Sequence, residues 1–253
     1  MNHPFLSVII PAYNEEKSLP GTLRSVFSYL GKQSYSWEVL VVNDGSEDRT
    51  KDLALEFQKS FPELRLIENF KNRGKGFAVK NGVLHSKGDL VLFMDADNST
   101  KINEIEKALP LLRGDITSVL PGQNPLLHSE QFDVIMGSRR LKDSLIVESQ
   151  PRHRRFLGEF FRVFTKILLD LPYDDTQAGF KIFNQRARRI FDLQTLSGFS
   201  FDAELLFLAK KIGLRVKEIP IQWENNASSH VSFKKMAHAL AELLKIRFKR
   251  YPM

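Results

Sequence analysis

Residues 1–100 alternate three times between a short apolar run and a helix-like segment, with a polar loop at each junction. The apolar runs cover residues 6–10, 37–42 and 64–67, and a fourth run, 89–94, follows the third helix-like segment. Short apolar runs bounded by loop residues predict buried strands. Strands that alternate with helices form right-handed βαβ units, which require a parallel sheet with helices on its faces. We therefore expect a mainly parallel α/β fold.

Three residues near the first junctions have expected roles of their own. Pro11 is expected to end the first strand, because proline lacks the N–H that a sheet uses. Asn14 is expected to cap a helix that reaches about Leu30, and Asp48 is expected to begin the next helix. A later strand is expected over residues 132–136.

Size and composition favour one large domain spanning residues 1–253, since 42% of the chain is hydrophobic. The chain has no cysteine, which excludes disulfides and thiolate metal sites. No signal-peptide pattern precedes the first strand, and no apolar run approaches the ~18 residues of a transmembrane helix. We expect a cytoplasmic protein, with peripheral attachment to the cytoplasmic membrane face left open.

The formal net charge of +7 and the isoelectric point near 9.5 favour anionic partners such as phosphates or lipid head groups. The basic excess lies in residues 139–155 and 234–250. A nucleic-acid-binding protein would carry this excess on the motif-bearing first half as well, so nucleic acid is not an expected partner.

Polar residues follow each strand of the first half, at the sheet edge where ligands of parallel α/β proteins bind. Asp44 follows the second strand and can accept a hydrogen bond from a base or ribose. Lys75 lies between two glycines, which lets it approach phosphates closely. Asp95 and Asp97 are two residues apart at the end of the fourth strand, so both project to one side and suit a hard divalent cation. Each cluster alone is also compatible with an ordinary turn.

Other ligand-binding signatures are missing. The chain has no GxxxxGK(S/T) motif and no GxGxxG after the first strand, which argues against P-loop nucleotidases and dinucleotide-binding dehydrogenases. Residues 198–202 lack the second glycine of a nucleophile elbow, and the six histidines show no metal-ligand spacing.

Four motifs, in order and spacing, resemble the nucleotide-sugar-binding half of inverting glycosyltransferases of the GT-A fold. They are residues 7–15 (SVIIPAYNE), 41–46 (VVNDGS), 72–76 (NRGKG) and 94–97 (MDAD). Three later motifs are similar to those of the dolichyl- or polyprenyl-phosphate sugar transferases, above all the dolichyl-phosphate β-glucosyltransferase branch that uses UDP-glucose. They are residues 137–139 (GSR), 175–181 (DTQAGFK) and 201–206 (FDAELL). The resemblance covers about residues 5–249 and implies a metal-dependent, inverting transfer of glucose from UDP-glucose to a polyprenyl phosphate.

The resemblance places the nucleotide-sugar site in residues 1–100. The implied nucleobase contacts are Pro11, Tyr13, Glu15 and Asp44. Lys75 and Asp95 would contact the ribose and diphosphate, and Asp95 and Asp97 would bind Mg²⁺ or Mn²⁺. Relatives often have a glutamine two residues past the second aspartate, where this chain has Ser99. The third metal ligand is therefore open between Ser99, water and the diphosphate.

The resemblance places the acceptor site in residues 101–230, and it implies Arg139 as a catalytic residue together with Lys75 and Asp97. The implied acceptor contacts are Arg139, Arg152, Arg155 and Gln177. A phosphate monoester acceptor is already anionic and needs no base. If the acceptor were a hydroxyl, the candidate bases are Asp175, Asp202 and Glu204. Each of these three is also compatible with a helix cap or a buried ion pair with Lys181.

Three segments of the second half are each compatible with more than one structural role. Residues 115–130 are either a lid or a plain surface loop. Residues 154–169 have apolar positions at helical spacing, typical of a core helix, although flanking arginines also suit an acceptor phosphate or anionic lipid. Residues 231–253 contain a basic amphipathic helix, which either lies in a membrane interface or packs on the domain.

Two alternatives to the leading function remain open from the sequence. The same fold accommodates GDP-mannose as the donor, or a soluble acceptor. A non-catalytic nucleotide-sugar-binding module is the second alternative, favoured by Ser99 and disfavoured by the intact Asp95 and Asp97.

Overall fold

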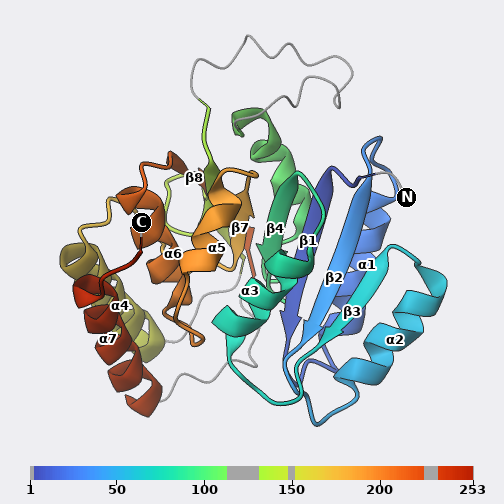
Figure 1. Ribbon diagram of the computed structural model, residues 1–253, viewed down its shortest axis with the longest axis horizontal. Helices are drawn as coiled ribbons and strands as arrows, with labels where there is room; N and C mark the ends of the chain where they lie inside the picture. Colours follow the sequence, from blue (N-terminus) through green and yellow to red (C-terminus); the bar gives the residue numbers. More distant parts are fainter. Residues whose placement is uncertain (1–2, 113–130, 148–151, 225–232, 253) are drawn as a thin grey trace.

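A computed structural model describes residues 3–112, 131–147, 152–224 and 233–252 (Figure 1). For residues 152–157 and 233–238 the description is limited to the backbone. The loop expected over residues 115–130 lies outside these ranges.

The centre of the molecule is a seven-stranded sheet with the strand order β3-β2-β1-β4-β7-β5-β8 (Figure 1). Its strands are β1 (Leu6–Ala12), β2 (Trp37–Asn43), β3 (Leu64–Glu68), β4 (Leu90–Met94), β5 (Val134–Ser138), β7 (Phe180–Phe183) and β8 (Val216–Pro220). Strand β7 runs antiparallel to β4 and β5, and every other pair in the sheet is parallel. The expectation of a mainly parallel sheet is confirmed.

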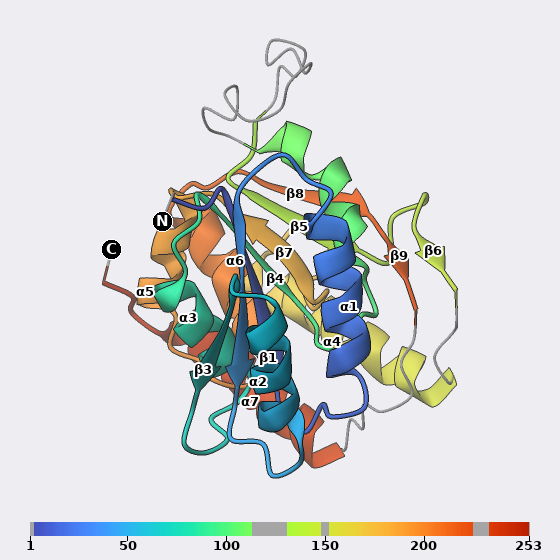
Figure 2. The same cartoon turned by 90° about the vertical axis from the view of Figure 1, so that its right-hand side faces the viewer.

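Helices cover both faces of this sheet (Figure 2). The helices are α1 (Leu19–Leu30), α2 (Thr50–Ser60), α3 (Lys75–His85), α4 (Arg152–Leu169), α5 (Ile190–Leu193), α6 (Phe201–Lys211) and α7 (Phe233–Phe248), with short 3-10 helices η1 (Ile102–Lys107), η2 (Leu109–Leu111) and η5 (Ala187–Arg189). Helices α1 and α2 share a core with one face, whereas α3 to α7 share a core with the other. Two short strands, β6 (Leu145–Ile146) and β9 (Gln222–Trp223), form a separate parallel pair.

The strands supply both cores because successive side chains point to opposite faces of a sheet. In β1, Val8 and Ile10 join the core under α1, whereas Ile9 joins the core under α3. In β4, Leu92 joins the core under α1 and Phe93 joins the core under α3. A strand that is apolar on both faces must be buried on both, as the continuous apolar runs in the sequence indicated.

Three local expectations were wrong. Strand β1 continues through Pro11, which pairs with Val42, because β4 accompanies β1 only as far as Ile9 and the missing N–H interrupts no second ladder. Helix α1 begins at Leu19 rather than after Asn14. The strand expected over residues 132–136 lies two residues later, as β5.

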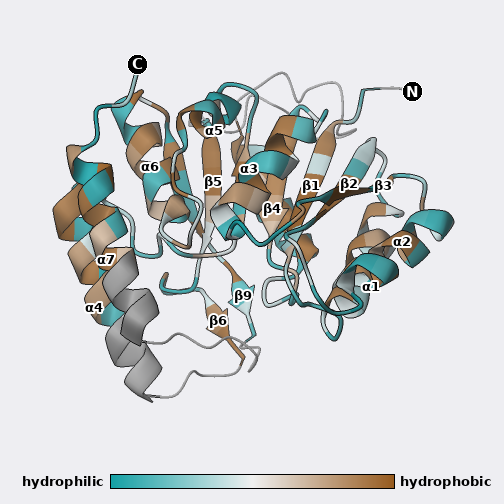
Figure 3. Ribbon diagram, turned by 60° about the horizontal axis from the view of Figure 1, so that its bottom comes forward, coloured by the Kyte–Doolittle hydropathy of each residue, from teal (hydrophilic) through white to brown (hydrophobic). Residues whose placement is uncertain are grey.

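Helices α4 and α7 lie side by side at one end of the molecule (Figure 3). Both helices have hydrophobic residues at the surface: Phe160, Val163 and Ile167 on α4, and Leu244 and Phe248 on α7. Within the described ranges, none of the helices has the combination of length and hydropathy that a bilayer crossing requires.

Candidate active site

The loops that follow β1 and β2 are joined into one unit by hydrogen bonds from backbone N–H groups to side-chain oxygens. Asn14 has a left-handed φ of 56°, its N–H donates to Ser46 Oγ at 3.0 Å, and its Oδ1 accepts from the N–H of Glu47 at 2.9 Å. The N–H of Glu15 donates to Thr50 Oγ1 at 2.8 Å. Asn14 therefore connects two loops instead of capping α1.

Asp44 at the end of β2 is buried and supports the loop that carries Lys75. Its carboxylate accepts from Asn69 Nδ2 at 2.8 Å, from the N–H of Arg73 at 3.1 Å and from the N–H of Gly74 at 2.8 Å. Only 2% of its surface is exposed. A contact of Asp44 with a nucleobase stays a prediction, whereas its support of this loop is directly visible.

A cavity of about 530 Å³ opens beside Asp44, between the ends of β1, β2 and β3. Its lining includes Tyr13, Ser46, Phe70 and Asn72. Tyr13 and Phe70 are exposed aromatic residues. The other predicted nucleobase contacts, Pro11, Glu15 and Asp44, do not line the cavity, and Pro11 is buried within β1. The cavity lies at the strand ends where the nucleobase is expected.

The structure brings Lys75 and Asp95 together from two different strand ends. Lys75 Nζ lies 2.5 Å from Asp95 Oδ1, and both side chains are partly buried. Burial lowers the pKa of Lys75, but the carboxylates of Asp95 and Asp202 outweigh burial, so the pKa lies above its ordinary value. Lys75 is therefore a fixed, fully charged cation.

Asp97 is held by the chain on either side of it. The N–H of Ser99 donates to Asp97 Oδ1 at 3.0 Å, and the Thr22 hydroxyl on α1 donates to the carbonyl of Ala96 at 2.6 Å. Burial and the nearby charge of Asp95 raise the pKa of Asp97, although hydrogen bonds from Ser99 oppose the rise. Two carboxylates that repel each other in a partly buried site favour a cation between them.

Glu15 adds a third acidic side chain near this pair. Burial raises the pKa of Glu15, and the charges of Asp97 and Asp95 raise it further. Even so, no group of three or more acidic or histidine side chains in the described ranges has ligand geometry for a metal. Asp95 and Asp97 are two hard oxygen donors that fit Mg²⁺ or Mn²⁺, and Ser99 orients Asp97 through hydrogen bonds.

Gly179 was not recognised from the sequence, although the site depends on it. A Cβ at this position would lie 1.9 Å from Asp95 Oδ2, so a side chain here would displace the Asp95 carboxylate. Gln177 lies in the same loop, and its Nε2 is buried with no hydrogen-bond partner in the described part of the protein. The only signal in the sequence was the glycine within the 175–181 motif.

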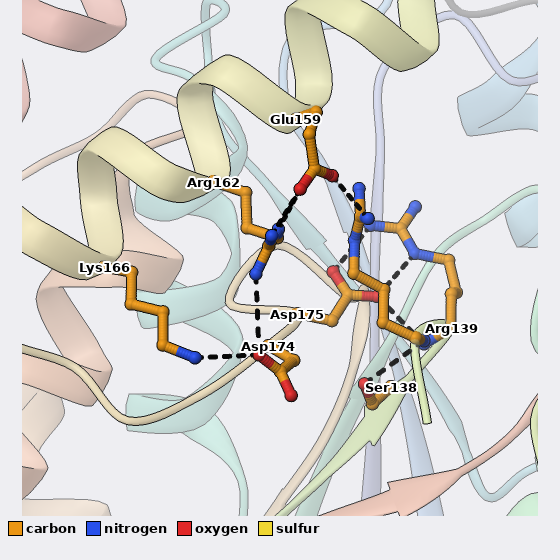
Figure 4. A network of polar contacts seen from close by, with 8 residues as sticks. Ser138, Arg139, Glu159, Arg162, Lys166, Asp174 and Asp175 are labelled. Carbon is orange, nitrogen blue, oxygen red and sulfur yellow. Dashed lines mark hydrogen bonds and ion pairs between the residues drawn. The ribbon is translucent and has the colours of Figure 1, made fainter. Parts of the chain in front are cut away.

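Arg139, at the end of β5, forms a two-pronged ion pair with Asp175 (Figure 4). Its Nε lies 2.7 Å and its Nη2 2.8 Å from the two carboxylate oxygens. Burial raises the pKa of Asp175, but Arg139 outweighs burial and the pKa ends below its ordinary value. The carboxylate of Glu218 on β8 accepts from the N–H groups of Asp174 and Asp175, a support that the sequence did not reveal.

A surface network connects α4 to this pair (Figure 4). Glu159 on α4 contacts Arg140 at 2.6 Å and also Arg162, and Asp174 contacts Arg162 and Lys166. The chain neighbours of Arg139 and Asp175 are thus anchored to one helix. The side chains of the predicted acceptor contacts Arg152 and Arg155, in the first turn of α4, lie outside the described residues.

The three carboxylates considered as bases all have structural partners. Asp175 pairs with Arg139, and Asp202 pairs with the fully buried Lys181 at 2.5 Å. Glu204 accepts hydrogen bonds from the N–H groups of Thr195 and Leu196. The predicted ion pair with Lys181 is confirmed for Asp202 alone, whereas Asp175 pairs with Arg139 and Glu204 binds the N–H groups of a loop before α6.

A mainly parallel sheet flanked by helices, with an acidic pair and a lysine at its carboxyl edge, matches the architecture of GT-A glycosyltransferases, and the comparisons with known proteins assign the chain to this class. The family model of glycosyl transferase family 2 matches residues 7–191. A dolichyl-phosphate β-glucosyltransferase of Trichomonas vaginalis is 33% identical over 252 residues, which cover 96% of this chain and 72% of the relative. The mouse (Mus musculus) dolichyl-phosphate β-glucosyltransferase is 33% identical over 253 residues, covering 96% and 75% of the two chains.

A solved structure supports the same fold. Glucosyl-3-phosphoglycerate synthase from Mycobacterium tuberculosis, in complex with Mn²⁺, UDP and glucosyl-3-phosphoglycerate, superimposes with a TM-score of 0.60 at 18% identity. The match covers 96% of this chain and 78% of that one. The chain belongs to glycosyl transferase family 2, and within it to the family of the dolichyl-phosphate β-glucosyltransferases, which confirms the family indicated by the sequence motifs.

Proposed function

We propose that this protein transfers glucose from UDP-glucose to a polyprenyl, dolichyl-type phosphate, with inversion at the anomeric carbon and with a bound Mg²⁺ or Mn²⁺. The observation that carries the proposal is the meeting of Lys75, Asp95 and Asp97 at one edge of the sheet. The names of the relatives suggest the glucose and the dolichyl phosphate. The UDP and Mn²⁺ of the glucosyl-3-phosphoglycerate synthase complex suggest the nucleotide and the metal.

The donor half of the reaction uses the loops after β1 to β4. The cavity beside Tyr13 offers space for the base. Pro11, Glu15 and Asp44 do not line this cavity, and their contacts with the base are proposed from the sequence motifs. Lys75 would receive the diphosphate as a preformed cation.

Asp97, with Asp95, would hold the divalent cation. When bound, the cation supplies charge neutralisation to the diphosphate oxygens. Burial and the charge of Asp95 raise the pKa of Asp97, and a cation bound beside it would favour the charged carboxylate, which supports this role.

The acceptor nucleophile is proposed to be a phosphate oxygen rather than a hydroxyl. Asp175, Asp202 and Glu204 are engaged by Arg139, Lys181 and backbone N–H groups, so each is an unsuitable base. A phosphate oxygen can form the bond to the anomeric carbon without losing a proton. The bond from that carbon to the donor β-phosphate breaks, and its electron pair leaves with UDP.

Arg139 is the proposed contact for the acceptor phosphate. Asp175 uses its Nε and Nη2 and leaves the Nη1 side of the guanidinium outside the pair. Gln177, with its unpaired Nε2, is a second proposed contact. Arg152 and Arg155 remain proposals from the sequence.

A lipid acceptor requires access to a membrane surface, and α4 with α7 is the proposed face. Phe160, Val163 and Ile167 share one side of α4 at helical spacing, and all three are exposed. Helix α7 packs against α4. It and the segment after it carry the exposed basic residues Lys245, Arg247, Lys249 and Arg250. Apolar residues flanked by basic ones suit the interface of an anionic membrane.

The test is a transfer assay with purified protein, Mn²⁺ and a short polyprenyl phosphate. UDP-glucose and GDP-mannose are compared as donors, and the free polyprenol replaces the phosphate in a parallel reaction. We expect glycolipid from UDP-glucose and the phosphate alone, and its loss in Asp97→Asn. Asp89→Asn is the matched control, because Asp89 precedes the same strand and contacts His3 and Gln185 at the opposite end.

Product from GDP-mannose alone would contradict the proposed donor. Equal product from the free polyprenol would contradict the phosphate nucleophile, and full activity in Asp97→Asn would contradict the metal role. Donor binding without transfer to any acceptor would favour a non-catalytic module.

A further inference from the structure

The first turn of α3, which begins with Lys75, is capped by a distant loop. The N–H groups of Gly76 and Phe77 donate to the carbonyl of Ser197 at 2.8 and 3.3 Å. The first N–H groups of a helix have no partner within the helix, and here no side chain of the N-cap residue supplies one. The position of this turn therefore depends on the position of residues 194–198.

Backbone packing makes this dependence close. A Cβ at Gly74 would lie 2.4 Å from the carbonyl oxygen of Ser197, and a Cβ at Gly76 would lie 2.8 Å from that of Leu196. Gln194 Nε2 also donates to the carbonyl of Gly76 at 2.9 Å. Because the two backbones are in direct contact at Gly74 and Gly76, a shift of the loop would displace the start of α3.

Glu204 on α6 holds this loop in place. Its fully buried carboxylate accepts from Thr195 Oγ1 at 2.6 Å and from the N–H of Leu196 at 2.8 Å. Tyr251, in the segment after α7, donates its hydroxyl to Glu204 Oε1 at 2.9 Å. Burial and Glu204 raise the pKa of Tyr251, so the phenol keeps the proton that it donates. A buried carboxylate depends on each of its donors, since a lost hydrogen bond is not replaced by water.

We infer that Tyr251 and Glu204 are positioning residues for Lys75. They fix residues 195–197, this loop caps the first turn of α3, and the capped turn aims the ammonium at Asp95. The consequence for catalysis rests on the proposed function, in which Lys75 contacts the donor diphosphate.

The test is Tyr251→Phe, which removes one hydroxyl and keeps the ring that packs near Phe207. Loss of a hydrogen bond to a buried charged group should speed amide exchange at the start of α3 by about tenfold or more, measured by hydrogen-exchange mass spectrometry. We expect the KM for the nucleotide sugar to rise by a similar factor, while the KM for the acceptor stays unchanged. Thr195→Val, which removes another donor to Glu204, should act in the same direction and serves if Tyr251→Phe folds poorly.

Tyr35→Phe is the matched control, because it removes a buried phenol hydroxyl from a residue that packs against Phe5 at the other end of the chain. It should change neither the exchange nor either KM. Unchanged exchange at the start of α3 in both Tyr251→Phe and Thr195→Val would overturn the inference, as would an equal rise in the two KM values. Lys75→Met distinguishes the proposed contact of Lys75 with the donor from the proposed positioning role of Tyr251. If it leaves the KM for the nucleotide sugar unchanged, the donor role of Lys75 fails, whereas amide exchange still decides whether Tyr251 controls α3.

Discussion

Lys75 Nζ lies 2.5 Å from Asp95 Oδ1, so a cation from the end of β3 and a carboxylate from the end of β4 form one unit. Lys75 is the first residue of α3, the helix that connects β3 to β4, and Asp95 follows β4. Both therefore lie at the edge where the parallel strands end. The pair fixes the lysine before any ligand arrives. Lysine otherwise loses about 2 kcal/mol of rotamer entropy when it is immobilised, so a fixed cation is a better receptor for a diphosphate.

Lys75→Met should lower the transfer rate by about a hundredfold or more, because it removes a fixed charge from the place where negative charge develops. Initial rates at saturating acceptor measure the effect. The Lys75 charge also opposes the rise in the pKa of Asp97, so its loss should make Asp97 easier to protonate.

Lys87→Met is the control for this change, since Lys87 is exposed and lies just beyond the opposite end of α3. It should leave the rate within about twofold of the wild-type value, as expected for a surface substitution worth less than about 0.5 kcal/mol. Equal loss in both variants would mean that general electrostatics, rather than the pair with Asp95, controls the rate.

Gly179→Ala should abolish most activity while the protein remains folded. The new Cβ would lie 1.9 Å from Asp95 Oδ2, so the carboxylate must rotate away from Lys75 and from the metal position. Gly21→Ala is the matched control: a Cβ there meets nothing within 4 Å, and alanine should stabilise α1 by about 0.5–1 kcal/mol. Thermal unfolding and Mn²⁺-induced stabilisation distinguish the two variants. Wild-type activity in Gly179→Ala would show that Asp95 need not keep this orientation.

The sequence predicted which loops lie at the carboxyl edge of the sheet because the strands and helices alternate regularly in the first half. Each strand of the first half ends in its own polar loop, so a parallel sheet places Lys75 and Asp95 at the same edge. Their direct contact also depends on α3, which packs against β1, because β2 and β1 separate β3 from β4. Gly179 was missed because its importance comes from β7, which runs antiparallel and carries its loop to Asp95 from far along the chain. The support of Asp175 by Glu218 was missed for the same reason, since it depends on a contact 43 residues apart. The prediction for Asn14 was wrong because asparagine favours two different positions, a helix cap and a turn with a left-handed φ. Here Asn14 has the left-handed φ, and its hydrogen bonds to the loop after β2 stabilise that conformation.

The pair of Arg139 and Asp175 predicts how stability depends on pH. The pKa of Asp175 is below its ordinary value, so its charged form stabilises the fold above the unfolded pKa of about 3.9. This contribution is lost as the pH falls from there through the folded pKa. Asp175→Asn should lower the free energy of unfolding by about 3–5 kcal/mol at pH 7, because it leaves a largely buried guanidinium without its partner.

Urea unfolding at pH 7 and at a series of lower pH values tests this dependence. The difference between Asp175→Asn and the wild type should shrink below pH of about 4, where the wild-type carboxyl also loses its charge. Asp143→Asn is the control, because Asp143 is exposed, and it should change stability by less than about 0.5 kcal/mol at every pH. If the difference in the free energy of unfolding between Asp175→Asn and the wild type stayed constant with pH, the packing of the Asp175 side chain, rather than its charge, would account for its contribution to stability.

The apolar side of α4 predicts retention on anionic vesicles at low salt. Ile167 is 76% exposed, so Ile167→Ser removes apolar surface without opening a cavity and should leave thermal stability nearly unchanged. If this side of α4 enters the membrane interface, the double variant Phe160→Ser, Ile167→Ser should weaken vesicle binding by at least about tenfold, since each buried large side chain contributes about 1.5–3 kcal/mol. Leu84→Ser removes an exposed leucine from α3 and should leave binding unchanged. Co-flotation with vesicles that contain phosphatidylserine measures the difference, and equal retention of all variants would place the membrane contact on another face of the molecule.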